Sequence, residues 1–596
     1  MNSLTKRLVA GVAAAATLLS GMALAGSAMA ADYGFTADDL SAKQTLTVTD
    51  STNKDLLNKT LVAVRLAKYT AGQYDENDKI TGYDIETMDE PSGLKSAIEA
   101  AAKKAAGSQA SEVDSDNPML WVIKNLTSLS DGTANSATAP YDGTLRDFLT
   151  ELAKSDVVKN ASGSTLSVND DGSSASAGSV DSGIYAIVDK TPTDASANGA
   201  QKIIASIPMM TGTAIGTNGK HNTLSNGTTL GTIEYKATLP TITKKITASG
   251  SAQGDGAVKT DSTASVLAVG DDVDYTLTAN IPNWNGYDSY YLAMNDTLGA
   301  GLTLKQNSFT VKVGDTTLTA DTDYRITVDG QSFRILFAPV SGETITSNLI
   351  QNGDTKSKFP VGGTITVTYK ATLNKNAVIG DASDSAGNPN TVNLEYSNNP
   401  STTDHGKTDD ITVKSYTGEL TIQKRDPKGN VDPILAGSTF AIKKKNAAAN
   451  LKFLVGADGV YTLVPDGYVA DAGETVSETL TVPTSGNIII KGLNGEYTIT
   501  ETKSAYGATF GLPSFDATVA VSQTNGNVTV TNKADTNQLV AVNSTAAANG
   551  AIVVKNVRNF TEMPKTGATW LCIYAAMALL CGGGAFLLLR SSKKNS

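Results

Sequence analysis

Most of the chain consists of short runs of β-favouring residues separated by turn residues. Residues 324–328 and 332–337 are two such runs, and they flank Asp329 and Gly330, a pair that favours a tight hairpin turn. Residues 364–369 form another run, rich in Thr, Val, Ile and Tyr, which are favoured in pleated, half-buried strands. The pattern predicts a mainly β fold.

Helical periodicity is confined to the first third of the chain. Apolar residues recur at helical spacing across residues 145–152, behind a candidate N-cap at Thr144, and residues 94–106 form a second, alanine-rich candidate. We therefore expect three tandem Ig-like β-sandwich domains with helical insertions in the first.

The length of 596 residues also suggests several domains, at roughly 100–200 residues each. Two strands of related pattern, at residues 239–246 and 418–426, mark where the second and third domains begin. We expect the following division: signal peptide 1–30, N-terminal domain 31–238, middle domain 239–415, C-terminal domain 416–562, and a terminal tail 563–596.

The N-terminal residues have the pattern of an export signal. Lys6 and Arg7 precede an apolar stretch at residues 8–24, and residues 28–30 (Ala-Met-Ala) give a small-x-small cleavage pattern. Cleavage there would make Ala31 the first residue of the exported chain.

The tail combines three features in a fixed order. Residues 571–589 carry no charge and approach the ~20 residues that cross a bilayer, and a basic stretch follows at residues 590–594. A pentapeptide stands before the apolar span: Met563, Pro564, Lys565, Thr566 and Gly567.

This arrangement resembles the sorting signal of Gram-positive surface proteins, in which a sortase cuts a Leu-Pro-x-Thr-Gly motif between Thr and Gly. The resemblance implies that a sortase thiol forms an acyl-enzyme with the carbonyl of Thr566 and that an amine resolves it, anchoring the chain to cell-wall peptidoglycan. Met563 replaces the Leu of the motif, and Met has a similar volume and is unbranched.

The amino-acid composition argues against several classes of function. The formal charge of −11 argues against nucleic-acid binding, and two histidines make a His-ligated metal site or a His-based catalytic relay improbable, so we expect no metal and no cofactor. The two cysteines, Cys572 and Cys581, both lie in the apolar tail. The exported chain would therefore lack disulfides and need another means of stabilisation.

Each of the two later domains begins with a lysine on an apolar strand face. Lys244 shares a face with Ile242, and Lys424 shares one with Ile422. A lysine that points inward is costly unless something neutralises or consumes it.

Asparagines end strands with the same inward pattern. Asn398 alternates with Tyr396, and Asn556 alternates with Val554. Asn532 is an alternative partner for the lysine of the third domain.

Two segments carry a family resemblance. Residues 497–507 read YTITETKSAYG and resemble the E-box of pilin and collagen-adhesin B-type domains, usually Y-x-L-x-E-T-x-A-P-x-G-Y; the stretch from Ser504 departs from it. Residues 296–303 read DTLGAGLT and resemble the Asp-Thr-Leu-x-x-Gly-Leu segment of Gram-positive pilin shaft domains. The resemblance implies that Glu501 and Asp296 are buried acids with a common role.

The resemblance implies that this role is to promote a bond between a lysine and an asparagine. Burial favours a neutral amine and a protonated acid, and the acid can polarise the amide while the amine attacks it. The resemblance implies two such isopeptide bonds: Lys244, Asn398 and Asp296 in the middle domain, and Lys424, Asn556 and Glu501 in the third. The alternatives are buried salt bridges or exposed residues at strand ends.

The resemblance also implies a pilus shaft (major fimbrial) subunit, whose copies a sortase joins head to tail through a lysine. In pilins that lysine follows Tyr-Pro; here residues 233–240 read IEYKATLP, so Lys236 is the candidate acceptor, with Lys220 and Lys202 as alternatives. Tip or minor pilins and host matrix or glycans are further possible partners. The rival interpretations are a monomeric wall-anchored adhesin that binds host matrix or glycans, and a secreted enzyme, for which the sequence offers no catalytic constellation.

Overall fold

The computed structural model describes residues 33–50, 56–126, 143–193, 204–235, 237, 239–250, 262–342, 346–380, 386–507, 511–533, 539–543, 551–559 and 562. The predicted signal peptide, the pentapeptide at 563–567, the apolar span at 571–589, Lys236 and Lys202 lie outside these ranges. Within them, every helix is too short or too polar to cross a membrane.

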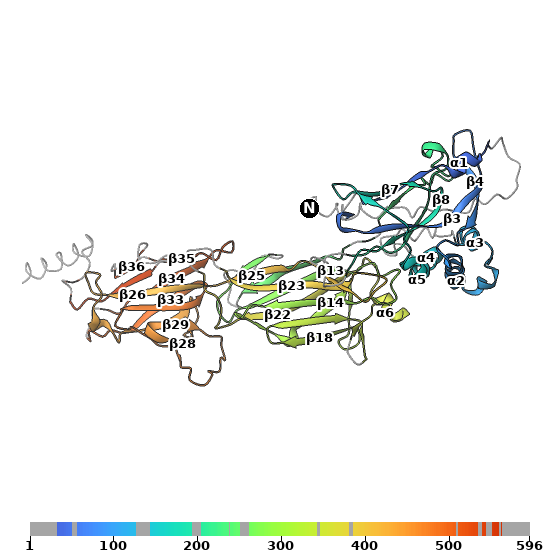
Figure 1. The fold of residues 1–596 in the computed structure, drawn as a ribbon. Helices are drawn as coiled ribbons and strands as arrows, with labels where there is room; N and C mark the ends of the chain where they lie inside the picture. Colours follow the sequence, from blue (N-terminus) through green and yellow to red (C-terminus); the bar gives the residue numbers. More distant parts are fainter. Residues whose placement is uncertain are drawn as a thin grey trace, which may run out of the picture.

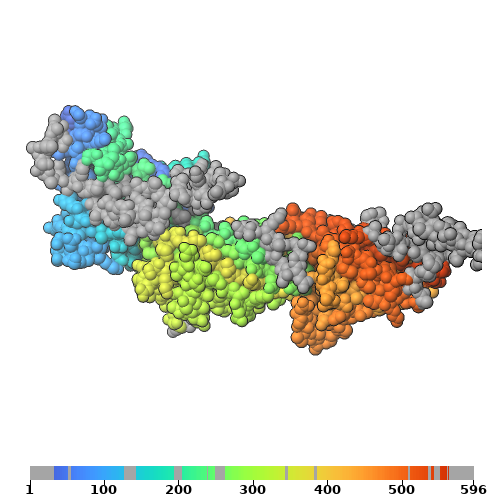
Figure 2. Space-filling model, turned by 180° about the vertical axis from the view of Figure 1, so that it is seen from behind, coloured from blue at the N-terminus to red at the C-terminus, as the bar shows by residue number. Residues whose placement is uncertain are grey.

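Three groups of sheets follow one another along the chain (Figure 1). The second and third groups lie end to end, and the first, which carries most of the helices, is set at an angle to them. Seen from behind, the coloured parts follow the same order from the blue to the red end (Figure 2).

The first group has three layers. A sheet built around β2 and β7 faces a second sheet built around β3 and β8, and apolar side chains fill the space between them. The other face of the β3–β8 sheet is covered by helices. The strands are β1 (Tyr33–Gly34), β2 (Gln44–Thr49), β3 (Leu61–Tyr74), β4 (Ile80–Thr87), β5 (Ser164–Thr165), β6 (Ser167–Val168), β7 (Ser174–Val180), β8 (Gly183–Asp189), β9 (Met209–Gly212) and β10 (Thr232–Glu234).

The helices confirm and extend the prediction. They are α1 (Ala37–Ser41), α2 (Leu94–Ala106), α3 (Pro118–Asn125), α4 (Thr144–Lys154) and α5 (Asp156–Lys159). Both predicted helices form, but the N-cap of α4 is Gly143, and Thr144 is the first helical residue. The helix α3 was not predicted from periodicity, because it has only eight residues and most of them are buried.

The middle group is a sandwich of two main sheets. One sheet contains β11 (Ile242–Gly250), β13 (Asp272–Asn280), β15 (Leu302–Leu304), β16 (Thr310–Val313), β17 (Thr316–Thr317) and β22 (Thr364–Leu373). The facing sheet contains β12 (Ala264–Val266), β14 (Leu292–Leu298), β18 (Tyr324–Asp329), β19 (Ser332–Phe337), β23 (Asn388–Ser397), β24 (His405–Lys407) and β25 (Ile411–Tyr416). A small sheet of β20 (Pro339–Val340) and β21 (Thr346–Ser347) and the helix α6 (Gly353–Lys358) complete it, so helix is not confined to the first third.

The third group is a second sandwich. Its larger sheet contains β26 (Gly418–Arg425), β28 (Phe453–Val455), β29 (Val460–Leu463), β30 (Val476–Ser477), β32 (Asn487–Leu493), β36 (Val540–Asn543) and β37 (Ala551–Lys555). Its smaller sheet contains β27 (Thr439–Lys444), β31 (Leu480–Thr481), β33 (Gly495–Lys503), β34 (Ser514–Val521) and β35 (Val528–Asn532).

Period-two alternation builds these cores. Along β13 the buried side chains alternate with half-buried ones, and the predicted hairpin forms with Asp329 opposite Ser332. Gly330 in its turn has a positive φ of 55°, which a residue without a Cβ adopts at little cost. Each buried aliphatic side chain contributes about 1.5–3 kcal/mol. The prediction of a mainly β fold of sandwich domains is confirmed.

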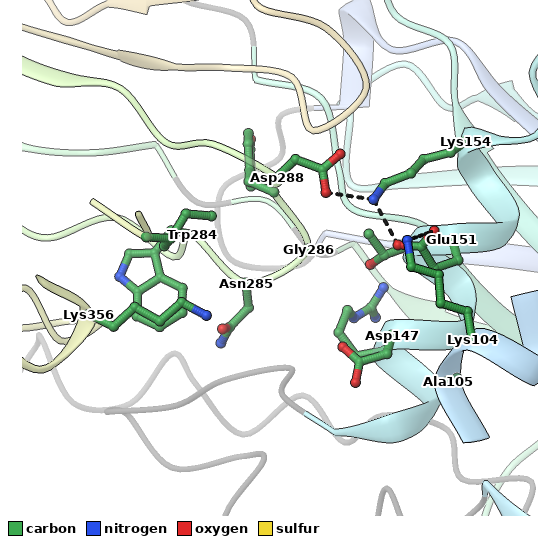
Figure 3. Close-up of a pocket in the computed structure, with 14 residues that line it drawn as sticks. Lys104, Ala105, Asp147, Glu151, Lys154, Trp284, Asn285, Gly286, Asp288 and Lys356 are labelled. Atoms are coloured by element: carbon green, nitrogen blue, oxygen red, sulfur yellow. Dashed lines mark hydrogen bonds and ion pairs between the residues drawn. The ribbon is translucent and has the colours of Figure 1, made fainter. Parts of the chain in front are cut away.

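The contacts between groups are polar as well as apolar. A pocket of about 350 Å³ lies between α4 of the first group and the loop at residues 284–288 of the middle group (Figure 3). There Lys154 Nζ lies 2.9 Å from Glu151 and 2.6 Å from Asp288. At the other end of the middle group, Lys375 Nζ lies 2.6 Å from both Asp471 and Glu474 of the third group.

Candidate functional sites: two buried lysine, acid and asparagine clusters

The first cluster forms around Lys244, inside the middle sandwich. Lys244 lies in β11 opposite Leu277 of β13, and strand alternation points its side chain inward with Ile242 and Ile246. The side chain is wholly buried. Its Nζ lies 2.5 Å from Asp296 Oδ2 and donates a hydrogen bond of 2.6 Å to Asn390 Oδ1.

The facing sheet supplies the acid and the amide. In the pairing of β14 with β23, Asp296 lies opposite Val392 and Leu298 lies opposite Asn390, so both polar side chains project from the same face. Asp296 and Asn390 are 1% and 0% exposed. The cluster therefore joins the two sheets of the sandwich.

Aromatic rings enclose the cluster. The rings of Tyr275 and Tyr369 lie 5.3 and 5.7 Å from Lys244 Nζ, and the two rings stack on each other. The Tyr369 hydroxyl donates to Asp296 Oδ2 at 2.9 Å and accepts from Asn390 Nδ2 at 2.8 Å. Among the described residues, Asp296 Oδ1 has no hydrogen-bond donor.

Burial moves both titrating groups toward neutrality. It lowers the pKa of Lys244 to about 8 and raises the pKa of Asp296, although each partner's charge opposes the shift. Burial also raises the pKa of Tyr369 well above its ordinary value, which keeps the phenol protonated. Burial thus favours a neutral amine beside a protonated acid.

The predicted partner of Lys244 is corrected by this geometry. Asn398 is buried, but its Nδ2 donates to the carbonyl of Thr193 in the first group, at 3.1 Å. Asn390 and Asn398 face the same way, so alternation does not distinguish them, but at about 3.3 Å per residue Asn398 lies about 26 Å further along the chain. The lysine meets the start of β23, not its end, and β23 is not the last strand of the group.

The second cluster forms around Lys424, inside the sandwich of the third group. Lys424 lies in β26, which pairs in parallel with β37 so that Lys424 stands opposite Val554 and the chain then reaches Asn556. Glu501 comes from β33 in the facing sheet. Lys424 Nζ lies 3.1 Å from Glu501 Oε2, and Asn556 Nδ2 donates to the same oxygen at 2.9 Å.

The electrostatics repeat those of the first cluster. All three side chains are buried, burial lowers the pKa of Lys424 to about 8, and burial raises the pKa of Glu501. Within the described part of the chain, Glu501 Oε1 has no hydrogen-bond donor. An ionised carboxylate with one oxygen so placed is costly, which favours its protonated form.

Two further observations bear on Asn556. The hydroxyl of Ser504 donates to Asn556 Oδ1 at 2.8 Å, a contact that the sequence did not predict. The alternative partner, Asn532, is half-buried and donates its amide to the carbonyl of Lys533. The geometry therefore places Asn556 and not Asn532 beside Lys424.

Each cluster holds the groups that acyl transfer to an amine needs. A buried amine, an acid that contacts it and an amide carbonyl with a hydrogen-bond donor stand within one hydrogen-bonded set. No cluster of metal-ligating side chains occurs among the residues that the structure describes.

The acceptor lysine is not placed by the structure, because Lys236 and Lys202 are outside the described ranges. Lys220 is described and exposed. Its Nζ lies 3.2 Å from Asp78 and 5.6 Å from the centre of the Tyr74 ring.

Comparison with known protein families matches one part of the chain, which includes the acid and the amide of the first cluster. Residues 269–400 match the model of the Gram-positive pilin backbone subunit 2, Cna-B-like domain, a stretch that includes Asp296, Tyr369 and Asn390. No curated protein matches the chain.

Solved pilin structures also resemble the chain. The T6 backbone pilin of serotype M6 Streptococcus pyogenes is 15% identical, with a TM-score of 0.46 over 88% of this chain and 90% of that one. The full-length major pilin SpaD from Corynebacterium diphtheriae is 17% identical, with a TM-score of 0.36 over 67% of this chain and 82% of that one. The major pilin subunit BcpA of Bacillus cereus is 15% identical, with a TM-score of 0.36 over 66% of this chain and 89% of that one.

Proposed function

We propose that this chain is the structural backbone subunit of a covalently polymerised, cell-wall-anchored pilus, stabilised by two Lys–Asn isopeptide bonds within its domains. The observation that carries the proposal is the pair of buried clusters, Lys244–Asp296–Asn390 and Lys424–Glu501–Asn556. The match of residues 269–400 to a pilin backbone family supports it. The domains would be residues 31–238, 239–415 and 416–562.

The bond-forming reaction needs no other reactant. The acid takes a proton from the lysine, and the neutral Nζ attacks Cγ of the asparagine. Nδ2 then receives that proton from the acid side of the site as its bond to Cγ breaks, so that it leaves as ammonia, and the new amide nitrogen gives its surplus proton back to the acid. Each site reacts once, so the chain is a substrate of its own chemistry and not a turnover enzyme.

The bonds would stabilise a chain without disulfides. The middle bond spans 146 residues, and a crosslink of that span removes about 5 kcal/mol of unfolded-state entropy by the model used for disulfides. Under tension the load between the bonded strands would pass through a covalent link. Because forced unfolding is governed by the unfolding rate, we expect the link to slow the unfolding of each domain under load.

Polymerisation would use the tail. We assign Thr566 as the acyl donor to a sortase and Lys236 of the next copy as the acceptor, with peptidoglycan taking the last acyl group. The alternative assignment, a monomeric wall-anchored adhesin, differs in having no acceptor lysine.

The polymer is tested by extracting cell-wall protein and separating it in denaturing gels. We expect a ladder of high mass for the unaltered chain, no ladder and no wall attachment for Thr566→Ala, and wall-attached monomer for Lys236→Arg, because each removes one partner of the new amide bond. Lys220→Arg and Lys202→Arg are the matched controls and should still form the ladder. A single monomer band from the unaltered chain would reject the pilus and favour the adhesin.

The Ser504 contact gives a separate expectation for the third domain. Ser504→Ala removes the donor to Asn556 Oδ1, where negative charge develops during attack, so we expect the third bond to form about a hundredfold more slowly. The rate is measured by quenching newly synthesised chain in denaturant and quantifying the crosslinked peptide by mass spectrometry. The middle bond serves as the internal control, and an unchanged rate for the third bond would remove Ser504 from the reaction.

A further inference from the structure

The two clusters differ in how the acid reaches the leaving nitrogen. In the third domain, Glu501 Oε2 contacts both Lys424 Nζ and Asn556 Nδ2. The acid can therefore take a proton from one nitrogen and give a proton to the other without help.

In the middle domain the acid does not contact the leaving nitrogen directly. Asp296 Oδ2 contacts Lys244 Nζ, but the leaving nitrogen, Asn390 Nδ2, donates its hydrogen bond to the hydroxyl of Tyr369. That hydroxyl in turn donates to Asp296 Oδ2. The phenol thus stands between the acid and the leaving group, with hydrogen bonds of 2.9 and 2.8 Å on its two sides.

We propose that Tyr369 is a catalytic residue of the middle site, which relays a proton from Asp296 to Nδ2 of Asn390 so that ammonia can leave. The inference rests on the proposed isopeptide chemistry and deepens it. The family resemblance supplied the lysine, the acid and an asparagine, whereas the role of Tyr369 follows from its two hydrogen bonds.

The direction of the relay follows from the electronic change at Nδ2. An amide nitrogen shares its lone pair with the carbonyl, so in the starting state Nδ2 donates to Tyr369. Once Lys244 Nζ has added to Cγ, the carbon is tetrahedral and Nδ2 becomes an amine with a free lone pair. It can then accept a proton from the hydroxyl.

The protons balance over the whole step. Asp296 first takes one proton from Lys244, passes it to the Tyr369 oxygen, and Tyr369 passes its own proton to Nδ2 as the bond from Cγ to Nδ2 breaks. The new nitrogen of the amide returns its surplus proton to Asp296. The products are the isopeptide bond, ammonia and a protonated Asp296, and Tyr369 ends as the neutral phenol with which it began.

The surroundings suit this role. Tyr369 is 1% exposed, and its ring is held by Tyr275 at 5.1 Å and Phe333 at 4.9 Å between centroids. A fixed, dry phenol keeps both hydrogen bonds aligned and leaves no solvent route for the proton.

The test measures how fast each bond forms. Full-length chain is synthesised in a cell-free system, samples are quenched in denaturant at intervals, and the two crosslinked peptides are quantified by mass spectrometry. For Tyr369→Phe we expect the middle bond to form about a hundredfold more slowly, the usual range for losing a positioned proton donor, and the third bond to form at the unaltered rate. The matched control is Tyr324→Phe, which removes a buried tyrosine hydroxyl from β18 of the same sandwich, away from the cluster, and should change the middle rate by less than about threefold.

The outcomes separate the relay from the function on which it rests. An unaltered chain that never forms the middle bond rejects the isopeptide proposal itself. A middle bond that forms at the unaltered rate in Tyr369→Phe rejects the relay alone. If Tyr369→Phe fails to fold, site-specific replacement of Tyr369 by a fluorotyrosine keeps the shape and the hydrogen bonds while lowering the pKa of the hydroxyl; its middle rate must then change its dependence on pH, and an unchanged profile overturns the relay.

Discussion

Replacing Asn390 by alanine is expected to abolish the middle crosslink completely, whereas replacing Asn398 leaves it intact. The reason is geometric, because Asn390 Oδ1 lies 2.6 Å from Lys244 Nζ while the amide of Asn398 bonds to Thr193. After correction for the substitution, Asn390→Ala should weigh about 17 Da more than the unaltered chain, the mass of one retained ammonia.

The control for this prediction is Asn398→Ala, which should keep the full loss of mass. It removes a buried hydrogen bond at the contact with the first group, so its cost is one of stability, about 1–3 kcal/mol. A chain that loses the ammonia in Asn390→Ala but retains it in Asn398→Ala would support the pairing of Lys244 with Asn398 that the sequence predicted.

Replacing Glu501 by glutamine is expected to eliminate the third crosslink and with it about 5 kcal/mol of the free energy of unfolding. The amide keeps the size of the side chain but can neither take a proton from Lys424 nor give one to Nδ2 of Asn556, so ammonia has no proton donor and does not leave. Mass spectrometry reports the bond, and guanidinium unfolding of the full chain reports the change in stability of the third domain.

Glu496 provides the matched control on the same strand, β33. Its carboxylate lies 2.7 Å from Lys445 Nζ and is 40% exposed, so Glu496→Gln should keep the bond and cost less than about 1 kcal/mol. A third bond that persists in Glu501→Gln would exclude Glu501 as the promoting acid.

The strands and the buried lysines were easier to predict from the sequence than the asparagines that lie beside those lysines. Lys244 and Lys424 could be predicted as buried because alternation along one strand assigns a side chain to a face. The asparagine partner depends instead on the direction in which a distant strand runs. In the third domain β37 runs parallel to β26 and ends beside Lys424, so an asparagine just after the strand lies near the lysine.

In the middle domain the choice of an asparagine at the end of a strand did not identify the neighbour of Lys244. Asn390 lies on the inward face of β23, and Asn398, one residue past the end of the strand, falls on the same side by alternation. Only the packing of one sheet on the other determines which of them Lys244 meets. An asparagine inside an apolar strand face, as at Asn390, was the signal available in the sequence.

The hydroxyl groups of Tyr369 and Ser504 could not be predicted as parts of the sites for a related reason. Tyr369 lies on β22, far along the chain from both Lys244 and Asp296, and its hydrogen bonds exist only once the sheets pack. Ser504 was visible only as a departure from the E-box pattern, and its contact with Asn556 gives that departure a physical meaning.

The most direct test of the account is the intact mass of the exported, folded chain purified without its tail. The account predicts a mass about 34 Da below that calculated from the sequence, one ammonia for each of two bonds, with fragment spectra that join Lys244 to Asn390 and Lys424 to Asn556. A mass equal to the calculated value, with both lysines unmodified, would contradict it.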